Sequence, residues 1–333
     1  MKHLKNIKMI ISKTPFRISL IGGGTDFPSY YKKKEGIVIG GTIDKYCYVT
    51  LRYLPNVFNY KHRIVWSKNE IVNTNNQIQH PIVKAVFNYM KINKGLELHY
   101  QGDLQKNSGL GTSSSFCVGL LNSLICLQNK SVSNKKLAKL ALNIEQNIMK
   151  EKCGSQDPIW ASYGGFNKII FNKKNFFVKK YNLNQQQLRV LSRNFFLIYT
   201  GINKFSNNIE KDKISNLSKN IYHLDSIYDL AKNFSEEISV AKNYDFIGNI
   251  LNEYWNIKKK LSFKVTNPII DEIYNESLIA GASGGKLIGS GGGGFLLVYC
   301  KKRYHKSLIN RLAKLPVIKF KFINTGSKII FKS

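Results

Sequence analysis

Residues 107–115 combine the residue types that bind phosphate. Gly109 and Gly111 flank a leucine, and hydroxyl residues follow before an almost wholly apolar run, 116–127. Such a run predicts a buried helix, because a surface helix would carry one polar face. A glycine-rich loop that leads into a helix directs the unpaired amides of the first turn, and the positive end of the helix dipole, at one point. That arrangement favours an anion, above all a phosphate; the alternative is an ordinary N-cap in which serines solvate the helix end.

A second glycine-rich segment, 281–294, has eight glycines in 14 positions. A flexible linker would carry serines and no apolar residues, whereas Leu287 and Ile288 lie inside this segment and a predicted strand, 295–299, follows it directly. The segment therefore predicts a folded turn in which the backbone approaches a ligand or another loop. The chain has neither a P-loop motif nor a Gly-x-Gly-x-x-Gly motif after its first strand, which argues against both of those modes of nucleotide binding.

The elements that would position these loops mix strands and helices without βαβ regularity, which predicts an α+β fold. The first is a strand over 10–21, which Pro15 interrupts and which ends in the glycines 22–24. Apolar residues at helical spacing predict a helix over 134–150, with Ser133 as its N-cap. Further strands are predicted at 37–43, 47–53, 96–100, 195–199, 295–299 and 317–323, and further helices at 81–90, 206–262 and 303–313. The best domain boundary is near residue 190.

Composition limits the classes of protein to which the chain can belong. Its 333 residues are 43% hydrophobic, enough for a large core and two domains. No run of about 18 apolar residues occurs, so we expect no membrane span, and the first apolar stretch is too short for a signal peptide. The five cysteines are scattered without a Cys-x-x-Cys pair, which favours reduced thiols and a cytoplasmic location over disulfides or a zinc site.

The net charge is +31, because the chain has 51 basic and 20 acidic residues. An anionic partner is one interpretation. The other interpretation is a general compositional bias toward Lys, Asn and Ile. This second interpretation is favoured, because the lysines are spread over the whole chain without a block of like charges. We therefore expect no nucleic-acid partner and no membrane partner, and an easier binding of anionic substrates only as a secondary effect of the charge.

Three motifs, in this order, resemble the GHMP kinases, the superfamily of galactokinase, homoserine kinase, mevalonate kinase and phosphomevalonate kinase. They are the opening motif 14–26, the phosphate-binding motif 108–114 and the closing motif 281–294. The resemblance implies a two-domain α+β fold with ATP and substrate in the cleft between the domains. Residues 1–190 would form the N-terminal domain with the ATP-binding loop and the catalytic aspartate. Residues 191–333 would form a ferredoxin-like C-terminal domain with the glycine-rich motif.

Within this superfamily the chain is similar to the bacterial D-glycero-D-manno-heptose 7-phosphate kinases. It shares with them Gly-Gly-Gly-Thr-Asp at 22–26, where galactokinases carry Glu and His at the second and third positions, and the pair Gln156-Asp157 ahead of a Gly-Gly-Phe-Asn turn. Three positions depart from the subfamily. Ser155 stands where Lys is common, Pro158 follows the aspartate, and Lys204 replaces a usual Arg.

The resemblance also implies roles for individual residues. Asp157 would accept the proton of the acceptor hydroxyl, and Arg17 would stabilise Asp157 or the moving phosphoryl group. ATP would bind Ser108, Gly109, Leu110, Gly111, Thr112, Ser113 and Ser114. Magnesium would be held by Thr112 or Ser113 together with Glu145. The acceptor sugar would contact Gly23, Gly24, Thr25, Asp26, Lys204, Gly291 and Gly292.

Each charged residue of this set has a purely structural alternative. Asp157 would be a turn aspartate before a proline, and Arg17 an edge-strand arginine that faces water. Glu145 would be a solvated helix residue, and Asp26 would cap the glycine turn.

These observations predict a cytoplasmic, ATP- and Mg²⁺-dependent sugar kinase. The acceptor would be the anomeric hydroxyl of D-glycero-D-manno-heptose 7-phosphate, and the product would be heptose 1,7-bisphosphate for surface-polysaccharide precursors. The alternatives are a fucokinase-like or other sugar 1-kinase, a decarboxylase relative, and, more remotely, a non-catalytic nucleic-acid binder. The sequence leaves the acceptor sugar, the anomer and the oligomeric state open.

Overall fold

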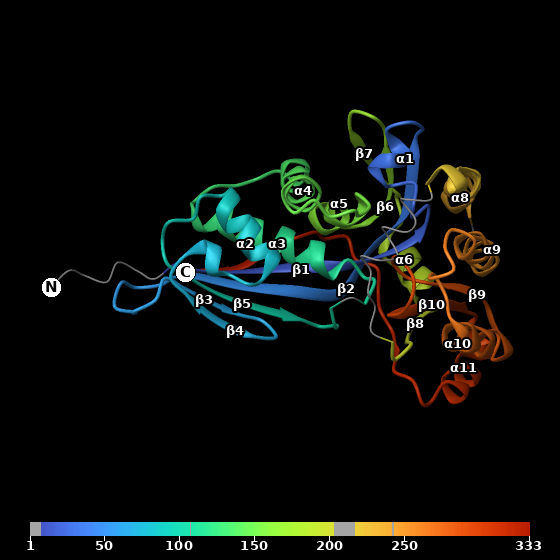
Figure 1. Cartoon of the computed structure of the whole chain (residues 1–333). Helices are drawn as coiled ribbons and strands as arrows, with labels where there is room; N and C mark the ends of the chain where they lie inside the picture. The colour runs from blue at the N-terminus through green and yellow to red at the C-terminus, as the bar shows by residue number, and fades with distance from the viewer. Residues whose placement is uncertain (1–7, 107, 203–216, 242) are drawn as a thin grey trace.

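Two β-sheets lie one after the other along the molecule (Figure 1) in the computed structural model, which describes residues 8–106, 108–202, 217–241 and 243–333. The larger sheet has the strand order β12-β1-β2-β5-β3-β4, with β6 paired to β2 and β7 to β6. Its strands are β1 Met9–Ile21, β2 Gly36–Tyr53, β3 His62–Val65, β4 Asn69–Val72, β5 Leu96–Gly102, β6 Phe166–Phe171, β7 Phe176–Lys180 and β12 Lys328–Lys332. The smaller sheet has the order β11-β8-β10-β9. Its strands are β8 Phe195–Tyr199, β9 Ala282–Leu287, β10 Phe295–Cys300 and β11 Val317–Ile318.

The opening strand is confirmed as β1, which pairs antiparallel with β2 over most of its length. The two strands predicted at 37–43 and 47–53 are one continuous strand, β2. Pro15 does not end β1. Proline has no backbone amide to donate to β2, and the register between the two strands shifts at this point, between Pro15 and Arg17, so that pairing continues beyond it. The amide of Arg17 instead donates to the carbonyl of Leu110, at 3.0 Å, in the predicted phosphate loop. The irregularity therefore attaches that loop to the first strand.

Helices lie on one face of the larger sheet (Figure 1). They are α2 Pro81–Tyr89, α3 Thr112–Leu127, α4 Asn134–Leu142 and α5 Gln156–Tyr163; a short helix, α1 Pro28–Tyr31, follows the glycine turn. The apolar run after the phosphate loop is confirmed as α3, which packs on β1 and β2 and is buried along almost its whole length. The helix predicted over 81–90 is confirmed as α2.

The helix predicted over 134–150 is an α-helix in its first half and a π-helix in its second half. Ser133 is its N-cap, since its hydroxyl accepts from the amide of Lys136 at 3.3 Å. After α4, however, residues 143–148 form a wider, π-helical turn, η2. Such turns commonly occur at functional sites, and this one buries the carboxylate of Glu145, which is 3% exposed.

The second half of the chain carries helices α6 Gln185–Arg193, α8 Leu217–Val240, α9 Ile247–Lys259, α10 Pro268–Ile279 and α11 His305–Arg311. Of these, α9 and α10 pack on the smaller sheet, whereas α8 packs on α9 and on strands β1 and β2 of the larger sheet. The helical region predicted over 206–262 is seen as α8 and α9, and its first residues lie outside the described ranges. The strand predicted over 317–323 is shorter, as β11. The chain then returns to the larger sheet, where β12 pairs with β1. The domain division near residue 190 stays a prediction.

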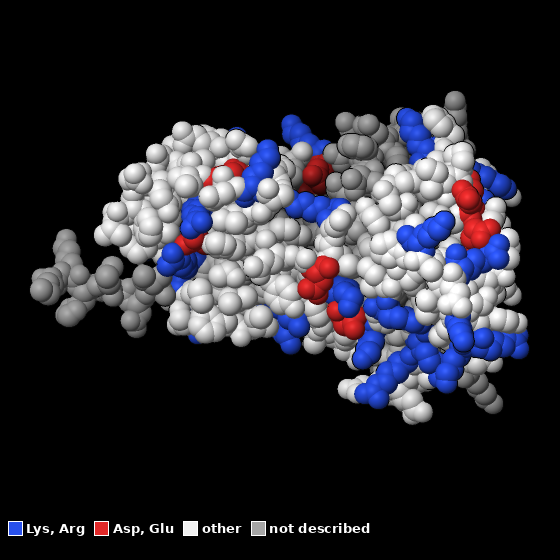
Figure 2. Space-filling model, turned by 90° about the horizontal axis from the view of Figure 1, so that it is seen from below, with Lys and Arg blue, Asp and Glu red and all other residues white. Residues whose placement is uncertain are grey.

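None of the helices in the described ranges is both long and apolar enough to cross a membrane. Figure 2 shows lysine and arginine side chains distributed over the visible face, with more of them toward the end that carries the smaller sheet and its helices.

Candidate active site

The predicted phosphate loop is held against β1 by hydrogen bonds at two points. Before α3, Leu110 accepts from the backbone of Arg17, and at the start of α3 the hydroxyl of Ser115 donates to the carbonyl of Pro15 at 2.9 Å. Gly111 ends the loop in the left-handed conformation, with φ of 72°, directly before the first helical residue. The first-turn amides, which have no acceptor within a helix, are therefore held in a fixed orientation.

The closing glycine segment packs against this loop, backbone on backbone. The carbonyl oxygen of Ile288 lies 2.6 Å from the position that a β-carbon on Gly109 would occupy, so only glycine fits there. The amide of Phe295 donates to the carbonyl of Ser108 at 3.4 Å. The prediction of a folded turn that approaches another loop is confirmed, although residues 282–287 of the segment form strand β9.

A buried lysine holds the middle of the closing segment. The ammonium of Lys258, on α9, donates to the carbonyls of Leu287 and Gly289 at 2.8 and 2.6 Å, and the residue is 3% exposed. Gly291 and Gly292 lie against Val265, whose carbonyl accepts from the amide of Gly292 at 2.9 Å. Contact of these two glycines with a sugar stays a prediction.

Arg17 joins the phosphate loop to Asp157. Its Nε and Nη2 donate to the two carboxylate oxygens of Asp157 at 2.6 and 2.5 Å, while Nη1 donates to the carbonyl of Gly109 at 2.5 Å. Arg17 is 4% exposed, so the alternative of an arginine that faces water is wrong. The side chain of Asp157 is 23% exposed, which leaves its carboxylate accessible to a substrate. Pro158 occupies the first turn of α5, where a proline costs little.

Asp26 is a second carboxylate close to this pair. Its Oδ1 accepts from the amide of Gly24 at 2.9 Å, and its Oδ2 accepts from the amide of Gln156 at 3.3 Å. Asp26 is 1% exposed. Burial, with a contribution from the negative charge of Asp157, raises its pKa to about 6 although the two amides oppose this. The bond to Gly24 is the turn cap expected as the structural alternative, and the bond to Gln156 ties Asp26 to the start of α5.

The hydroxyl of Thr25 serves the turn itself. It donates its one proton to the carbonyl of Gly22 at 2.8 Å and also lies 3.0 Å from the carbonyl of Ile37, and the residue is fully buried. The turn also contacts a residue that sequence reasoning missed: the hydroxyl of Tyr254, on α9, donates to the carbonyl of Gly23 at 2.9 Å.

The predicted magnesium ligands differ in exposure. Ser113 is exposed at the start of α3, Thr112 is buried, and Glu145 is buried in η2. Burial raises the pKa of the Cys117 thiol in α3, and the negative charge of Glu145 raises it further. Within the described ranges, no group of three or more His, Cys, Asp or Glu side chains is placed to hold a metal ion. A hydroxyl and a carboxylate fit Mg²⁺ when phosphate oxygens complete the coordination.

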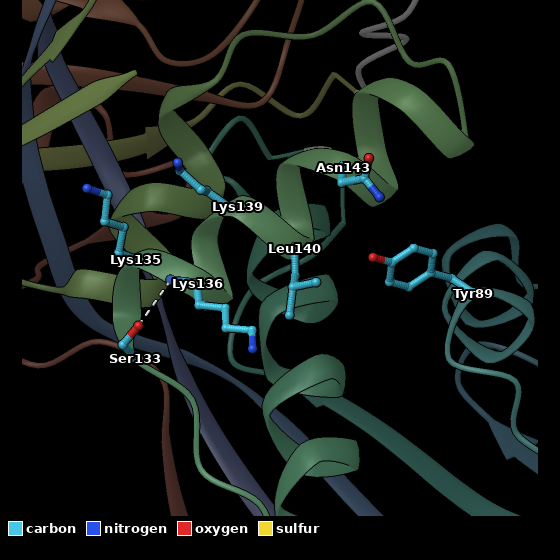
Figure 3. A pocket seen from close by; sticks show the side chains of 7 residues that line it. All are labelled: Tyr89, Ser133, Lys135, Lys136, Lys139, Leu140 and Asn143. Atoms are coloured by element: carbon cyan, nitrogen blue, oxygen red, sulfur yellow. Dashed lines mark hydrogen bonds between the residues drawn. The ribbon is translucent and has the colours of Figure 1, made fainter. Parts of the chain in front are cut away.

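Lys204 lies outside the described residues. A surface pocket of about 420 Å³ between α2 and α4 contains none of the predicted site residues and is lined by Tyr89, Ser133, Lys135, Lys136, Lys139, Leu140 and Asn143. In Figure 3 the side chains of Lys135 and Lys139 point away from Tyr89, toward the left of the view, whereas that of Lys136 points downward. The three ammonium groups do not converge on one ligand position.

Comparison with known proteins identifies related chains. The family description "GHMP kinases N terminal domain" matches residues 76–165 and "GHMP kinases C terminal" matches residues 230–316, together more than half of the chain. The chain is 28% identical to the D-glycero-alpha-D-manno-heptose 7-phosphate kinase of Campylobacter jejuni, over 97% of this chain and 99% of that one.

Two further matches are more distant. The bifunctional fucokinase/GDP-fucose pyrophosphorylase of Arabidopsis thaliana is 24% identical over 86% of this chain and 29% of its own. A crystal structure described as a D-glycero-D-manno-heptose 1-phosphate kinase from Bacteroides thetaiotaomicron superposes with a TM-score of 0.77 at 21% identity, over 96% of this chain and 97% of that one. This structural match shows the shared fold.

Proposed function

The chain belongs to the GHMP kinases, a family of ATP-dependent phosphotransferases, and from this we propose that it phosphorylates the anomeric hydroxyl of D-glycero-D-manno-heptose 7-phosphate. The product would be heptose 1,7-bisphosphate, a precursor of surface polysaccharides. The name of the 28% identical relative supports this acceptor. The match to a fucokinase supports a second candidate, a fucose-like sugar 1-kinase.

The observation that carries the proposal is the position of Arg17 between the phosphate loop and a carboxylate. One guanidinium contacts Gly109 of the loop and both oxygens of Asp157. A phosphoryl donor bound at the loop and a hydroxyl bound at Asp157 would therefore be neighbours, which is what in-line transfer requires.

In this mechanism Asp157 accepts the proton of the acceptor hydroxyl as the oxygen attacks the γ-phosphorus. The bond from this phosphorus to the bridging oxygen breaks, and ADP leaves with the electron pair. Arg17 fixes the orientation of Asp157 through its two-point contact, and the amides at the start of α3 stabilise the negative phosphate oxygens. A Mg²⁺ ion held by Ser113 or Thr112 and Glu145 would supply charge neutralisation at the phosphates.

The acceptor would be held on the other side of Asp157, where Asp26 is tied to Gln156, the residue directly before Asp157. A carboxylate can accept hydrogen bonds from two sugar hydroxyls. Lys204 is proposed, from its place in the sequence, to bind the 7-phosphate.

The test is ATP consumption with a panel of acceptors: D-glycero-D-manno-heptose 7-phosphate, the unphosphorylated heptose, L-fucose and D-galactose. We expect the highest kcat/KM for the 7-phosphate. Loss of a charge-assisted hydrogen bond in Lys204→Ala should lower that value roughly 10- to 150-fold without changing the KM for ATP. Equal kcat/KM values for the two heptoses would contradict this acceptor, and a preference for L-fucose would select the second candidate.

A further inference from the structure

The buried lysine of α9 contacts the closing segment on both sides of one residue. The ammonium of Lys258 donates to the carbonyls of Leu287 and Gly289 at 2.8 and 2.6 Å. The residue between them is Ile288, whose carbonyl oxygen lies 2.6 Å from the position of a β-carbon on Gly109. Lys258 therefore holds the backbone on either side of the point where the closing segment meets the predicted phosphate loop.

The backbone that the lysine holds is rich in glycine. Residues 291–294 are all glycine, and Gly289 has a φ of 72°. Glycine loses more conformational freedom on folding than any other residue, so such a segment needs contacts to keep one conformation. Its far end also lies against the phosphate loop, since a β-carbon on Gly294 would be 2.7 Å from the carbonyl oxygen of Ser108. The position of the phosphate loop therefore depends on how well the closing segment is fixed.

The ammonium is a donor that an apolar side chain cannot replace. Lys258 is 3% exposed, and a buried ammonium is costly unless it is hydrogen-bonded. An apolar side chain would fill the same space without that cost but could not donate to the two carbonyls. The adjacent Lys259 provides a comparison, because both ammonium groups lie 5.9 Å from the centre of the Trp255 ring. Of these two lysines, in the described part of the chain, only Lys258 donates to the closing segment.

We propose that Lys258 is a positioning residue for ATP, which acts through the closing segment on the phosphate loop. This inference rests on the proposed function, because it requires ATP to bind at that loop. The amides at the start of α3 stabilise phosphate oxygens most when they are already oriented before the nucleotide binds. Loss of the ammonium should therefore weaken ATP binding and leave the binding of the acceptor sugar unchanged.

The test is Lys258→Met in the full-length protein, which removes the ammonium and keeps an unbranched side chain of similar length. The dissociation constant for ATP with Mg²⁺, measured by calorimetry without acceptor, should rise about 5- to 150-fold, the usual range for a coupling between separate sites. The KM for the acceptor sugar should not change. A structural defect alone would not divide the two substrates in this way.

Two variants of the same helix are matched controls. Lys259→Met removes the neighbouring charge, and Tyr254→Phe removes a buried hydrogen bond of α9 that goes to the carbonyl of Gly23 and not to the closing segment. Both should bind ATP as the wild type does. Equal dissociation constants for ATP in the wild type and in Lys258→Met would overturn the inference and leave the proposed function intact. An equal rise in Tyr254→Phe would also overturn it, because any disturbance of α9 would then weaken ATP binding.

Amide hydrogen exchange of the wild-type protein is a second measurement, and it does not depend on the folding of a variant. Because a coupling between two sites is reciprocal, saturating ATP should slow exchange in peptides that cover residues 287–294. Unchanged exchange there, in protein that calorimetry shows to bind ATP, would overturn the inference. If the wild-type protein binds no ATP, the proposed function fails, and this inference fails with it.

Discussion

A β-carbon on Gly111 would lie 3.3 Å from Oδ2 of Asp157. The residue that ends the predicted phosphate loop therefore lies directly beside the carboxylate proposed as the base. Arg17 lies in the same place, since its Cγ and Nε would be 3.2 and 3.3 Å from that β-carbon. If the loop binds the nucleotide and Asp157 accepts the proton, as proposed, a side chain at residue 111 would disturb both steps.

Gly111→Ala should impair both steps. The alanine would be strained at φ of 72° by roughly 1–2 kcal/mol, and its β-carbon would press on the Arg17–Asp157 pair. We expect weaker ATP binding by calorimetry and a lower kcat. Gly201→Ala is the control, because Gly201 has a φ of 73° but nothing within 4 Å of a β-carbon. It should lose similar stability and keep its ATP affinity. Equal affinities in the two variants would place the nucleotide elsewhere.

Asp157→Asn should lower kcat about 10²- to 10⁴-fold, the usual effect of losing a general base, with little change in ATP binding. Steady-state kinetics and calorimetry measure the two quantities separately. Asp245→Asn removes a carboxylate from an exposed ion pair with Lys301 and should leave kcat unchanged. Near-normal turnover by Asp157→Asn would remove this residue from the mechanism.

Arg17→Lys keeps the positive charge but loses the planar fork that contacts Asp157 and Gly109 together. Because charge-assisted hydrogen bonds are lost, kcat should fall roughly 10- to 150-fold. Arg52→Lys provides the comparison, since Arg52 also contacts a carboxylate, that of Glu97, through Nε and Nη2. A similar fall in both variants would show that the effect is not specific to the active site.

The pH dependence should report on Asp26, whose pKa burial raises to about 6. Below that pH the neutral carboxyl can no longer accept from two sugar hydroxyls, so kcat/KM for the sugar should decrease. In Asp26→Asn the value should be low at every pH and lack this decrease. A wild-type profile that is flat between pH 5 and pH 7 would separate Asp26 from sugar binding.

The same group gives a signed prediction for stability. A raised pKa means that the folded state binds the proton more tightly than the unfolded state. The stability from Asp26 is therefore fully present below about pH 4 and is lost as the pH rises to about 6, by roughly 3 kcal/mol. Thermal unfolding of Asp26→Asn should be less dependent on pH in this window than that of the wild type.

Local sequence patterns predicted the elements that carry the site. The apolar run of α3, the cap of Ser133 and the glycine turns depend on neighbours in the chain, so composition and spacing reveal them. The contact of Tyr254 with Gly23 joins residues 231 positions apart and leaves no local signal. Strand β12 is short and mostly exposed, and its three consecutive apolar residues lack the alternation that marks a half-buried strand.

Two other differences have physical causes. The apolar residues of 134–150 indicate a helix but do not show where it widens into a π-turn, so the burial of Glu145 could not be predicted. The burial of Arg17 depends on Leu110, which accepts from its amide at the point where β1 changes register. That pairing requires the loop and the strand to meet in space.

The most direct test of the proposed reaction is ³¹P NMR of the products formed by the wild-type protein from ATP, Mg²⁺ and D-glycero-D-manno-heptose 7-phosphate. The account predicts ADP together with a new sugar phosphate signal coupled to the anomeric proton, while the 7-phosphate signal remains. ADP and inorganic phosphate without a new sugar phosphate, or a new phosphate at another carbon, would contradict it.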